Sequence, residues 1–342
     1  MIFQKTIRNE ISEVGVGLHS GEKVKLKLKP GIVGQGIIFK KMDQKKETQV
    51  KVDPTIVLDT RLCSTIGNKD FQIATVEHLM SALCASGIDN ITIEVSGSEI
   101  PIMDGSAITF IHLIKSAGIV DQQAPKEFIR IKKTIEARQE DKFAIFEPHQ
   151  GFVIDFTIDF PHPVFKTEDS HVKIDFFQDS YVQDISRART FGFMQEVEAL
   201  RSNGLARGGS LDNAIVVDEY KVINKDGLRY KDEFVRHKIL DAMGDLFMLG
   251  KPLLGKFTAF KSGHDLNNKL IRKLAENPDT WEVATLDLES VETANLAQQY
   301  LDSKSEYESR DYITYHDFLK ISRDSYINWN YCFGNFLYCY KK

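Results

Sequence analysis

The stretch that decides the fold is DEFVRHKILDAMGDLFMLG, residues 232–250. At about 100° per residue, apolar side chains fall on one side of this stretch: Val235, Ile239, Ala242, Met243, Leu246 and Leu249. The opposite side carries polar residues and one glycine: His237, Asp241, Gly244 and Asp245. Lys238 lies at the edge of this polar side. We therefore predict an amphipathic helix over residues 232–249.

His237 and Asp241 stand four residues apart in this helix, so their side chains lie one turn above each other. This spacing brings two ligands within reach of one metal ion. An isolated pair of this kind more often belongs to a solvated polar face. Gly244 favours a site, because glycine inside a helix costs about 1 kcal/mol relative to alanine and often marks a close approach by another segment.

A second helix is predicted over residues 75–86, where apolar residues recur with helical spacing and Gly87 follows as a stop signal. Thr75 can cap this helix, which places Glu77 and His78 in its first turn. A neighbouring imidazole and carboxylate allow one residue to bind a metal while the other acts on a water molecule. For this dipeptide alone, a surface glutamate and a capping histidine are the simpler interpretation.

His78, His237 and Asp241 together supply two imidazoles and one carboxylate. This ligand set is typical of a catalytic zinc site, which keeps one coordination position open. Because His78 and His237 are far apart in the sequence, the sequence alone does not show whether their side chains lie close together. Two more histidines, His19 and His264, occur in glycine-containing turns, and each alone fits ordinary turn chemistry.

The rest of the chain alternates between strand and helix patterns. Period-two alternation and short apolar runs predict strands at residues 23–28, 91–95, 128–135, 143–147, 152–160 and 214–217. Further helices are predicted at residues 108–117 and 194–202. A polar segment with a proline, 121–126, is the predicted domain boundary. We expect an α+β protein with two similar domains and an aromatic-rich extension of unassigned role: 1–122, 127–302 and 303–342.

Composition limits the function. The 342 residues carry a net charge of −5, with 42% hydrophobic and 27% charged residues, which argues against broad nucleic-acid binding. The four cysteines form no Cys-x-x-Cys pair, so neither a disulfide framework nor a thiolate zinc knuckle is expected. No apolar run has the length of a signal peptide or a membrane span. We expect a cytoplasmic protein without a transmembrane segment.

Seven segments carry a resemblance to a known family: GVGLHSG (15–21), TVEHLMSAL (75–83), EIPIMDGSA (99–107), SRARTFGFM (186–194), GGSLDNAIVV (208–217), DEFVRHKILDAMGDL (232–246) and AFKSGHDLNNKL (259–270). In content and order they resemble the UDP-3-O-acyl-N-acetylglucosamine deacetylases, the LpxC family. The resemblance implies two α+β domains, each a small β-sheet layered with α-helices, with the active site between them. It does not cover the extension.

The resemblance also implies a role for each matching residue. Three residues match the zinc ligands: His78, His237 and Asp241. Five match catalytic groups: Glu77, His264, Asp245, Thr190 and Lys238. In this scheme Glu77 is the general base, and His264, held and kept charged by Asp245, is the general acid. One zinc ion per chain is expected, although the same ligands also suit iron(II).

The implied reaction is zinc-dependent hydrolysis of the N-acetyl group of UDP-3-O-(3-hydroxyacyl)-N-acetylglucosamine, which releases acetate in the committed step of lipid A biosynthesis. An apolar passage for the acyl chain and further substrate contacts are expected at six residues: His19, Phe191, Phe193, Ala206, Ser210 and Val216. One base and one acid predict a bell-shaped pH profile. Cys63 matches a thiol near the site that we expect to be non-essential. Because the expected substrate carries a lipid chain, the sequence leaves undecided whether the protein makes transient contact with a membrane.

Three other functions stay open at this point. The first is a metal-dependent deacylase of another acylated nucleotide sugar, and the second is a non-catalytic nucleotide-sugar sensor. Intact Glu77 and His264 argue against a sensor, which needs no acid–base pair. The third is an interaction protein acting through residues 303–342. The sequence leaves undetermined the acyl-chain length, the metal loaded in the cell, the oligomeric state and the role of the extension.

Overall fold

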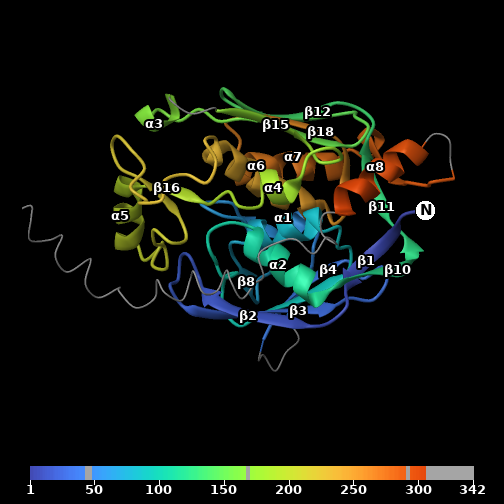
Figure 1. Cartoon of the computed structure of the whole chain (residues 1–342), viewed down its shortest axis with the longest axis horizontal. Coiled ribbons are helices and arrows are strands. Elements are labelled where there is room, and N and C mark those ends of the chain that lie inside the picture. The colour runs from blue at the N-terminus through green and yellow to red at the C-terminus, as the bar shows by residue number, and fades with distance from the viewer. Residues whose placement is uncertain (43–47, 167–169, 290–292, 306–342) are drawn as a thin grey trace, which may run out of the picture. The chain divides into compact units, whose positions relative to one another are not determined.

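Two larger β-sheets with helices between them form the framework of the computed structural model (Figure 1). The structure describes residues 1–42, 48–166, 170–289 and 293–305. These residues all belong to one compact unit, and their mixture of separate sheets and helices confirms the expected α+β class. Among them, no helix has both the length and the apolar character needed to cross a bilayer.

The first half of the chain builds a five-stranded sheet. In spatial order its strands are β2 (Ile11–Val16), β3 (Lys23–Pro30), β9 (Ile91–Val95), β4 (Ile37–Lys41) and β5 (Gln49–Lys51). Strands β4 and β9 run parallel, and the other neighbours run antiparallel. The alternation predicted at residues 23–28 is confirmed, since Val24 and Leu26 are buried while Lys23 and Lys25 are exposed.

Smaller strand pairs complete the first half: β1 (Phe3–Ile7) with β10 (Ile119–Pro125), and β6 (Val57–Asp59) with β7 (Thr65–Gly67) and β8 (Gln72–Ile73). A short 3-10 turn, η1 (Pro54–Ile56), precedes β6. The polar segment 121–126 lies mostly within β10, which pairs antiparallel with β1. It is therefore not a free linker, and the division into residues 1–122 and 127–302 stays a prediction.

Two helices of the first half, α1 (Glu77–Ala85) and α2 (Ile108–Ala117), lie on the inner side of this sheet (Figure 1). Helix α2 has the bounds that the sequence predicts. Helix α1 begins at Glu77, and the proposed cap at Thr75 is wrong: the capping position is Val76, with no side-chain capping bond. Thr75 instead has a φ of +58°, a conformation unsuited to a helix start. Gly87 follows the helix with a φ of +71°, as expected of a stop signal.

The second half builds a seven-stranded sheet. Its strands are β12 (Ile135–Gln139), β13 (Lys142–Glu147), β18 (Leu253–Phe260), β11 (Glu127–Ile131), β19 (Trp281–Thr285), β14 (Phe152–Thr157) and β15 (His171–Asp175). The single strand predicted over 128–135 is wrong, because the chain turns between β11 and β12, where the N–H groups of Lys132 and Lys133 bond to Thr280. The strand predicted over 152–160 ends earlier, at Thr157.

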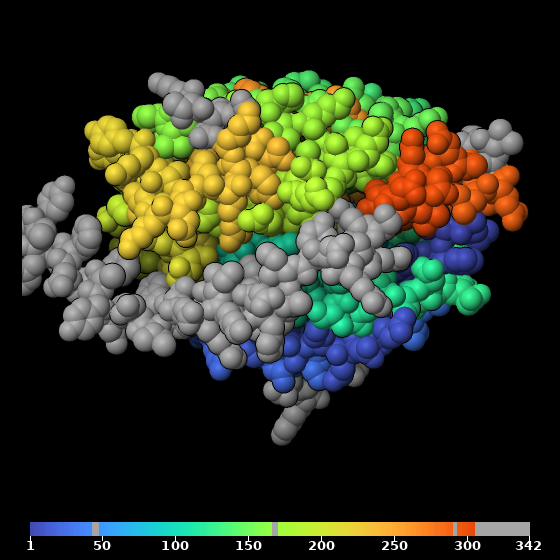
Figure 2. All heavy atoms as spheres, in the orientation of Figure 1, coloured from blue at the N-terminus to red at the C-terminus, as the bar shows by residue number. Residues whose placement is uncertain are grey.

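The remaining elements of the second half are α3 (Pro163–Lys166), α4 (Tyr181–Asp184), β16 (Phe191–Phe193), α5 (Met194–Ser202), β17 (Ile215–Val217), α6 (Glu233–Leu246), η2 (Phe247–Leu249), α7 (His264–Glu276), η3 (Pro278–Thr280) and α8 (Ala294–Ser305). The helix predicted from the opening stretch is confirmed as α6, with its last three residues in the 3-10 turn η2. In Figure 2, the segment containing α5 (yellow) forms the surface at one end of the visible face, and α8 (orange-red) forms it near the other end.

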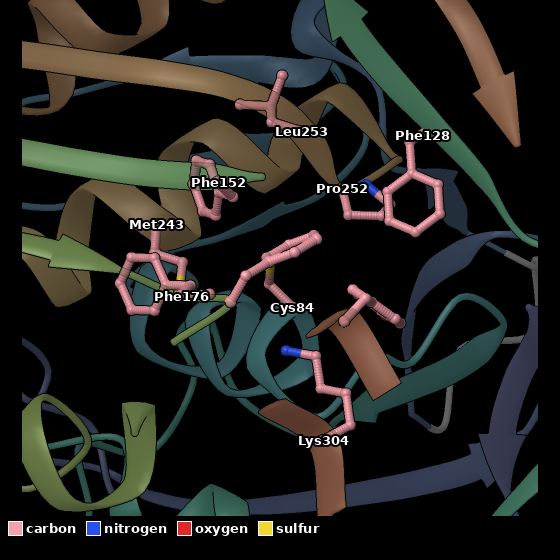
Figure 3. A pocket seen from close by; sticks show the side chains of 10 residues that line it. Cys84, Phe128, Phe152, Phe176, Met243, Pro252, Leu253 and Lys304 are labelled. Carbon is pink, nitrogen blue, oxygen red and sulfur yellow. The ribbon is translucent and has the colours of Figure 1, made fainter. Parts of the chain in front are cut away.

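A small cavity lies under α8 (Figure 3). It holds about 20 Å³, and its lining is mainly apolar: Cys84, Phe128, Phe152, Phe176, Phe177, Met243, Pro252, Leu253, Tyr300 and Lys304. Met243 enters it from the apolar side of α6, away from the polar side that carries His237 and Asp241. With room for about one water molecule, the cavity is part of the core.

Candidate active site

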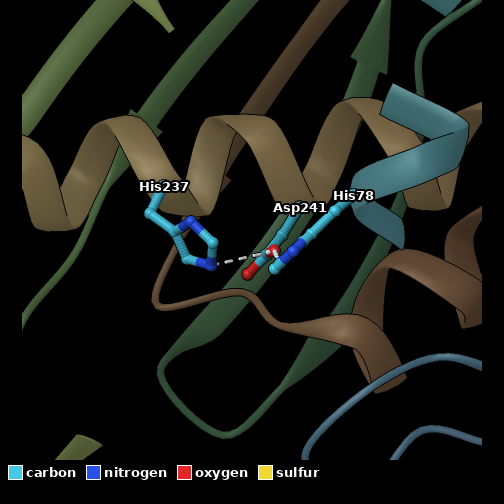
Figure 4. Close-up of side chains that lie close together, drawn as sticks. All are labelled: His78, His237 and Asp241. Atoms are coloured by element: carbon cyan, nitrogen blue, oxygen red, sulfur yellow. Dashed lines mark ion pairs between the residues drawn. The ribbon is translucent and has the colours of Figure 1, made fainter. Parts of the chain in front are cut away.

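Three side chains from two distant segments meet where helix α1 crosses helix α6 (Figure 4). His78 comes from the first turn of α1, while His237 and Asp241 come from consecutive turns of α6. One ligand atom from each residue lies within 4.8 Å of the other two, and all three residues are buried. The fold thus brings together the three residues for which the sequence predicts a metal site.

Gly244 makes this helix crossing feasible. A Cβ atom at Gly244 would lie 2.0 Å from the carbonyl oxygen of Glu77 and 3.0 Å from its Cα. Any side chain would therefore push α1 off α6 and carry Glu77 and His78 away from His237. The close approach predicted from a glycine inside a helix is confirmed.

The three residues point acceptor atoms at one another. Oδ1 of Asp241 lies 3.4 Å from Nε2 of His78 and 3.3 Å from Nε2 of His237. The Nδ1–H of His237 donates to the Ala188 carbonyl at 3.0 Å, so its Nε2 carries a lone pair. Oδ1 of Asp241 is buried and has no hydrogen-bond partner among the described residues. A buried carboxylate oxygen with an imidazole nitrogen of each histidine beside it fits a bound cation.

Charges around the centre keep these groups in the form that binds a metal. Burial lowers the pKa of His237 to about 4, and the nearby Asp241 only partly offsets it, so the imidazole is neutral near pH 7. Burial alone would raise the pKa of Asp241, but positive charge beside it, that of Lys238 included, outweighs burial and holds that pKa well below its usual range. Lys238 contributes through an ion pair of 2.8 Å with Oδ2 of Asp241.

A candidate acid–base pair lies next to the three ligands. Glu77 is buried beside His78, and burial raises the pKa of its carboxyl group. His264 opens helix α7, and its Nε2 lies 4.0 Å from Oε1 of Glu77. Its Nδ1–H donates to Oδ2 of Asp245 at 2.8 Å. Burial would lower the pKa of His264, but Asp245 and Glu77 outweigh this effect and raise it to about 9. Glu77 thus suits a base and His264 an acid.

Sequence reasoning missed a set of buried polar residues behind this pair. The hydroxyl of Ser64 donates to Oδ1 of Asp245 at 2.6 Å, and the amide of Asn267 donates to Oδ2 at 2.9 Å. Ser262 in turn donates to Asn267 at 2.6 Å. Asn267 and Ser262 stand within a segment that the resemblance covers, but neither has a spacing signal of its own.

A buried ion pair holds the strand β16 against the start of α6. The guanidinium of Arg189 bonds to Glu233 at 2.9 and 3.1 Å, and both residues are buried. The next residue, Thr190, donates its N–H to Gly105 at 2.8 Å. Phe191 follows, with its ring 6.2 Å from that of His237. The segment that carries Thr190 and Phe191 is therefore fixed beside His237, one of the three candidate ligands.

The other predicted substrate contacts lie on three neighbouring elements. Phe193 ends β16 among the rings of Phe160 and His162, and Val216 lies in the partner strand β17. Ala206 and Ser210 lie in the loop between α5 and β17. That loop meets the turn that carries His19, because the N–H of Arg207 donates to the His19 carbonyl at 3.2 Å. Ala206 has a φ of +50°, and burial lowers the pKa of His19.

Cys63 is buried close to Glu77. Burial, and next the charge of Glu77, raise the pKa of its thiol to about 12. A thiol of this kind stays protonated near neutral pH and is a poor metal ligand or nucleophile. The centre has its two imidazoles and its carboxylate without it.

The chain is similar to known proteins over most of its length. Residues 4–276 match the family model described as UDP-3-O-acyl N-acetylglycosamine deacetylase. A relative from Thioalkalivibrio sulfidiphilus is 54% identical over 290 residues, which are 85% of this chain and 95% of the relative. Another, from Teredinibacter turnerae, is 53% identical over 297 residues, which are 87% of this chain and 97% of the relative. Both relatives are named UDP-3-O-acyl-N-acetylglucosamine deacetylase.

Proposed function

Since the chain belongs to the family of UDP-3-O-acyl-N-acetylglucosamine deacetylases, we propose that it hydrolyses the N-acetyl group of UDP-3-O-(3-hydroxyacyl)-N-acetylglucosamine. The products are acetate and the free amine, and the reaction is the committed step of lipid A biosynthesis. One observation supports this most: a buried His–His–Asp cluster has a carboxylate and a histidine, Glu77 and His264, directly beside it.

The metal of this site is Zn²⁺ in our proposal. His78, His237 and Asp241 would hold it, because one possible ligand atom from each residue lies within 4.8 Å of the other two in a buried cluster. When bound, such an ion polarises the acetyl carbonyl and makes a nearby water more acidic. Fe²⁺ suits the same ligands, and metal analysis of the purified protein distinguishes the two.

The chain's own residues move the protons. The Glu77 carboxylate takes a proton from the attacking water as the water oxygen bonds to the carbonyl carbon. Protonated His264 then gives its proton to the nitrogen as the C–N bond breaks, so the amine departs neutral. Asp245 keeps His264 oriented and charged through the 2.8 Å bond to Nδ1. Thr190, which precedes Phe191 beside His237, and Lys238, which is paired with Asp241, are proposed to steady the negative oxygen.

The acyl chain is proposed to lie along β16, β17 and the loop that precedes β17. Five residues supply the lining: Phe191, Phe193, Ala206, Ser210 and Val216. His19, in the adjoining turn, is proposed to contact the substrate. Substitutions along this lining should change the preferred acyl length, whereas indifference would favour a deacylase of another acylated nucleotide sugar.

The setting of the enzyme also remains a proposal. We place it in the cytoplasm, with the UDP-linked substrate as its partner, no nucleic acid and at most transient contact with a membrane. A non-catalytic sensor is less well supported, because Glu77 and His264 form an acid–base pair, which the binding of a nucleotide sugar alone does not need. A role for the aromatic extension as an interaction element concerns residues that lie almost entirely outside the described part of the chain.

The test is acetate release from UDP-3-O-(3-hydroxyacyl)-N-acetylglucosamine by the purified full chain. Glu77→Gln, which keeps the size of the side chain but removes the base, should lose most activity. Chelation should abolish release, and added Zn²⁺ should restore it. No release from folded, zinc-loaded protein would refute the proposed function.

A further inference from the structure

Ser64 lies between the two carboxylates that serve the acid–base pair. It immediately precedes β7 and is 3% exposed. Its N–H donates to Oε2 of Glu77 at 3.0 Å, and its hydroxyl donates to Oδ1 of Asp245 at 2.6 Å. Its carbonyl accepts the N–H of Val76 at 3.4 Å. One residue thus joins the start of α1 to the end of α6.

Both carboxylates also face His264, and Asp245 does so mainly through the oxygen that Ser64 does not hold. Oε1 of Glu77 lies 4.0 Å from Nε2 of the imidazole, and Oδ2 of Asp245 lies 2.8 Å from Nδ1. The imidazole therefore has one carboxylate at each nitrogen, and Ser64 connects the far sides of both. The four residues close a ring of contacts. In such a ring, the distance between the base and the acid depends on Ser64.

We infer that Ser64 is a positioning residue of the hydrolysis: its N–H holds the general base Glu77, and its hydroxyl holds Asp245, so that His264 keeps its place opposite the base. The inference rests on the proposed function and adds to it a residue that touches neither metal nor substrate. The hydroxyl bond is short, buried and made to a carboxylate, which are the conditions under which a hydrogen bond fixes geometry most firmly.

Without the hydroxyl, Oδ1 of Asp245 loses its shortest hydrogen bond and keeps only the longer contact of 3.1 Å with Nδ1 of His264. Asn267 still holds Oδ2 at 2.9 Å, but apart from His264 itself it is then the one side chain that fixes the carboxylate among the described residues, so the carboxylate can turn about its last torsion together with the imidazole. The imidazole that hydrogen-bonds to it would turn as well, which moves Nε2 relative to Glu77. Misplacement of a proton donor lowers the rate of the chemical step and leaves substrate binding nearly unchanged.

Ser64→Ala is the decisive variant, because it keeps the main-chain N–H to Glu77 and removes only the hydroxyl. We expect kcat for acetate release to fall by about 10- to 100-fold, the effect of a lost hydrogen bond to a charged group, with KM changed by less than about twofold. Ser64→Thr, which keeps a hydroxyl, should recover most of the loss. Bound metal, measured by elemental analysis, should be equal in all three proteins.

A double-mutant cycle separates positioning from packing. In an Asp245→Ala background the hydroxyl has no carboxylate to hold, so adding Ser64→Ala should cost less than about twofold. The matched control is Ser86→Ala, since Ser86 is also buried but its hydroxyl bonds to none of the residues that the structure describes. That variant should keep the wild-type kcat.

Four results would overturn the inference. The first is a kcat of Ser64→Ala close to wild type, and the second is an equal loss in the Asp245→Ala background. The third is a loss in Ser64→Thr as large as in Ser64→Ala, which would assign the effect to packing. The fourth is an inactive wild-type enzyme in the same assay, which would remove the proposed function and this inference together, whereas the first three leave the proposed function intact.

Discussion

Replacing Gly244 with alanine tests the helix crossing on which the site depends. The new Cβ would lie 2.0 Å from the carbonyl oxygen of Glu77 and 2.8 Å from its carbonyl carbon. Both atoms belong to the backbone of α1 and cannot rotate away. The two helices must therefore separate, or α1 must tilt, for the variant to fold.

The cost follows from two opposing effects. Overpacking of a core costs about 1–3 kcal/mol, and a clash with backbone puts this site at the upper end. Alanine gains about 1 kcal/mol over glycine inside a helix. We expect a net loss of about 2 kcal/mol in the free energy of unfolding, equivalent to a fall of about 3 °C in melting temperature for a unit of this size.

Activity should fall further than stability alone requires. Separation of the helices moves Glu77 and His78 relative to His237, and a displacement of about 1 Å at a catalytic group costs about 100-fold in rate. Urea unfolding and acetate release measure the two effects.

Gly192→Ala, in β16, is the matched control for this experiment. A Cβ there meets one methyl carbon of Val197 at 3.4 Å and nothing else within 4 Å, so stability should hardly change. A Gly244→Ala variant that is as stable and as active as wild type would refute the account of the crossing.

Three further predictions concern protons, metal and an ion pair. The rate of acetate release should have a bell-shaped dependence on pH. Glu77 must be deprotonated, and burial raises its pKa, whereas His264 must be protonated and has a pKa of about 9. A rate that does not fall above pH 9 would contradict the assignment of His264 as the acid. Asp241→Ala should bind no zinc, so chelation should lower the melting temperature of the wild type but not that of the variant; equal shifts would place the metal elsewhere. Arg189→Ala leaves the buried carboxylate of Glu233 without its ion-pair partner. The free energy of unfolding, measured with urea, should fall by about 3 kcal/mol, and a fall well below 1 kcal/mol would show that the ion pair does little for the fold.

Local patterns in the sequence were sufficient for the elements that carry the site. The polar side of α6 is visible in the order of its residues, because a helix repeats every 3.6 residues whatever surrounds it. The same holds for β3 and β9, where alternation marks one buried face. The cap proposed at Thr75 failed, because the bond between Ala74 and Ser98 and the contact of Thr75 with Glu99 fix the backbone there through partners distant in the sequence.

The resemblance supplied the list of site residues, and the structure supplied their relations. His78 and His237 come together only because α1 crosses α6 at Gly244. No pattern in the sequence around Ser64 indicates that this residue bonds to both Glu77 and Asp245. A hydrogen bond between residues far apart in the chain leaves no periodic trace, so such a residue is invisible until the chain is folded.

The sequence by itself determined which chemical groups the protein contains, where its main helices and strands run, and which family it resembles. Only the tertiary structure decided which groups meet and which are charged. The physical reason is that periodicity depends on the local geometry of the backbone, whereas ligand distances and pKa values depend on burial and on neighbours from other segments. The same imidazole side chain has a pKa of about 4 at His237 and about 9 at His264, because both are buried but only the second has a carboxylate at each nitrogen.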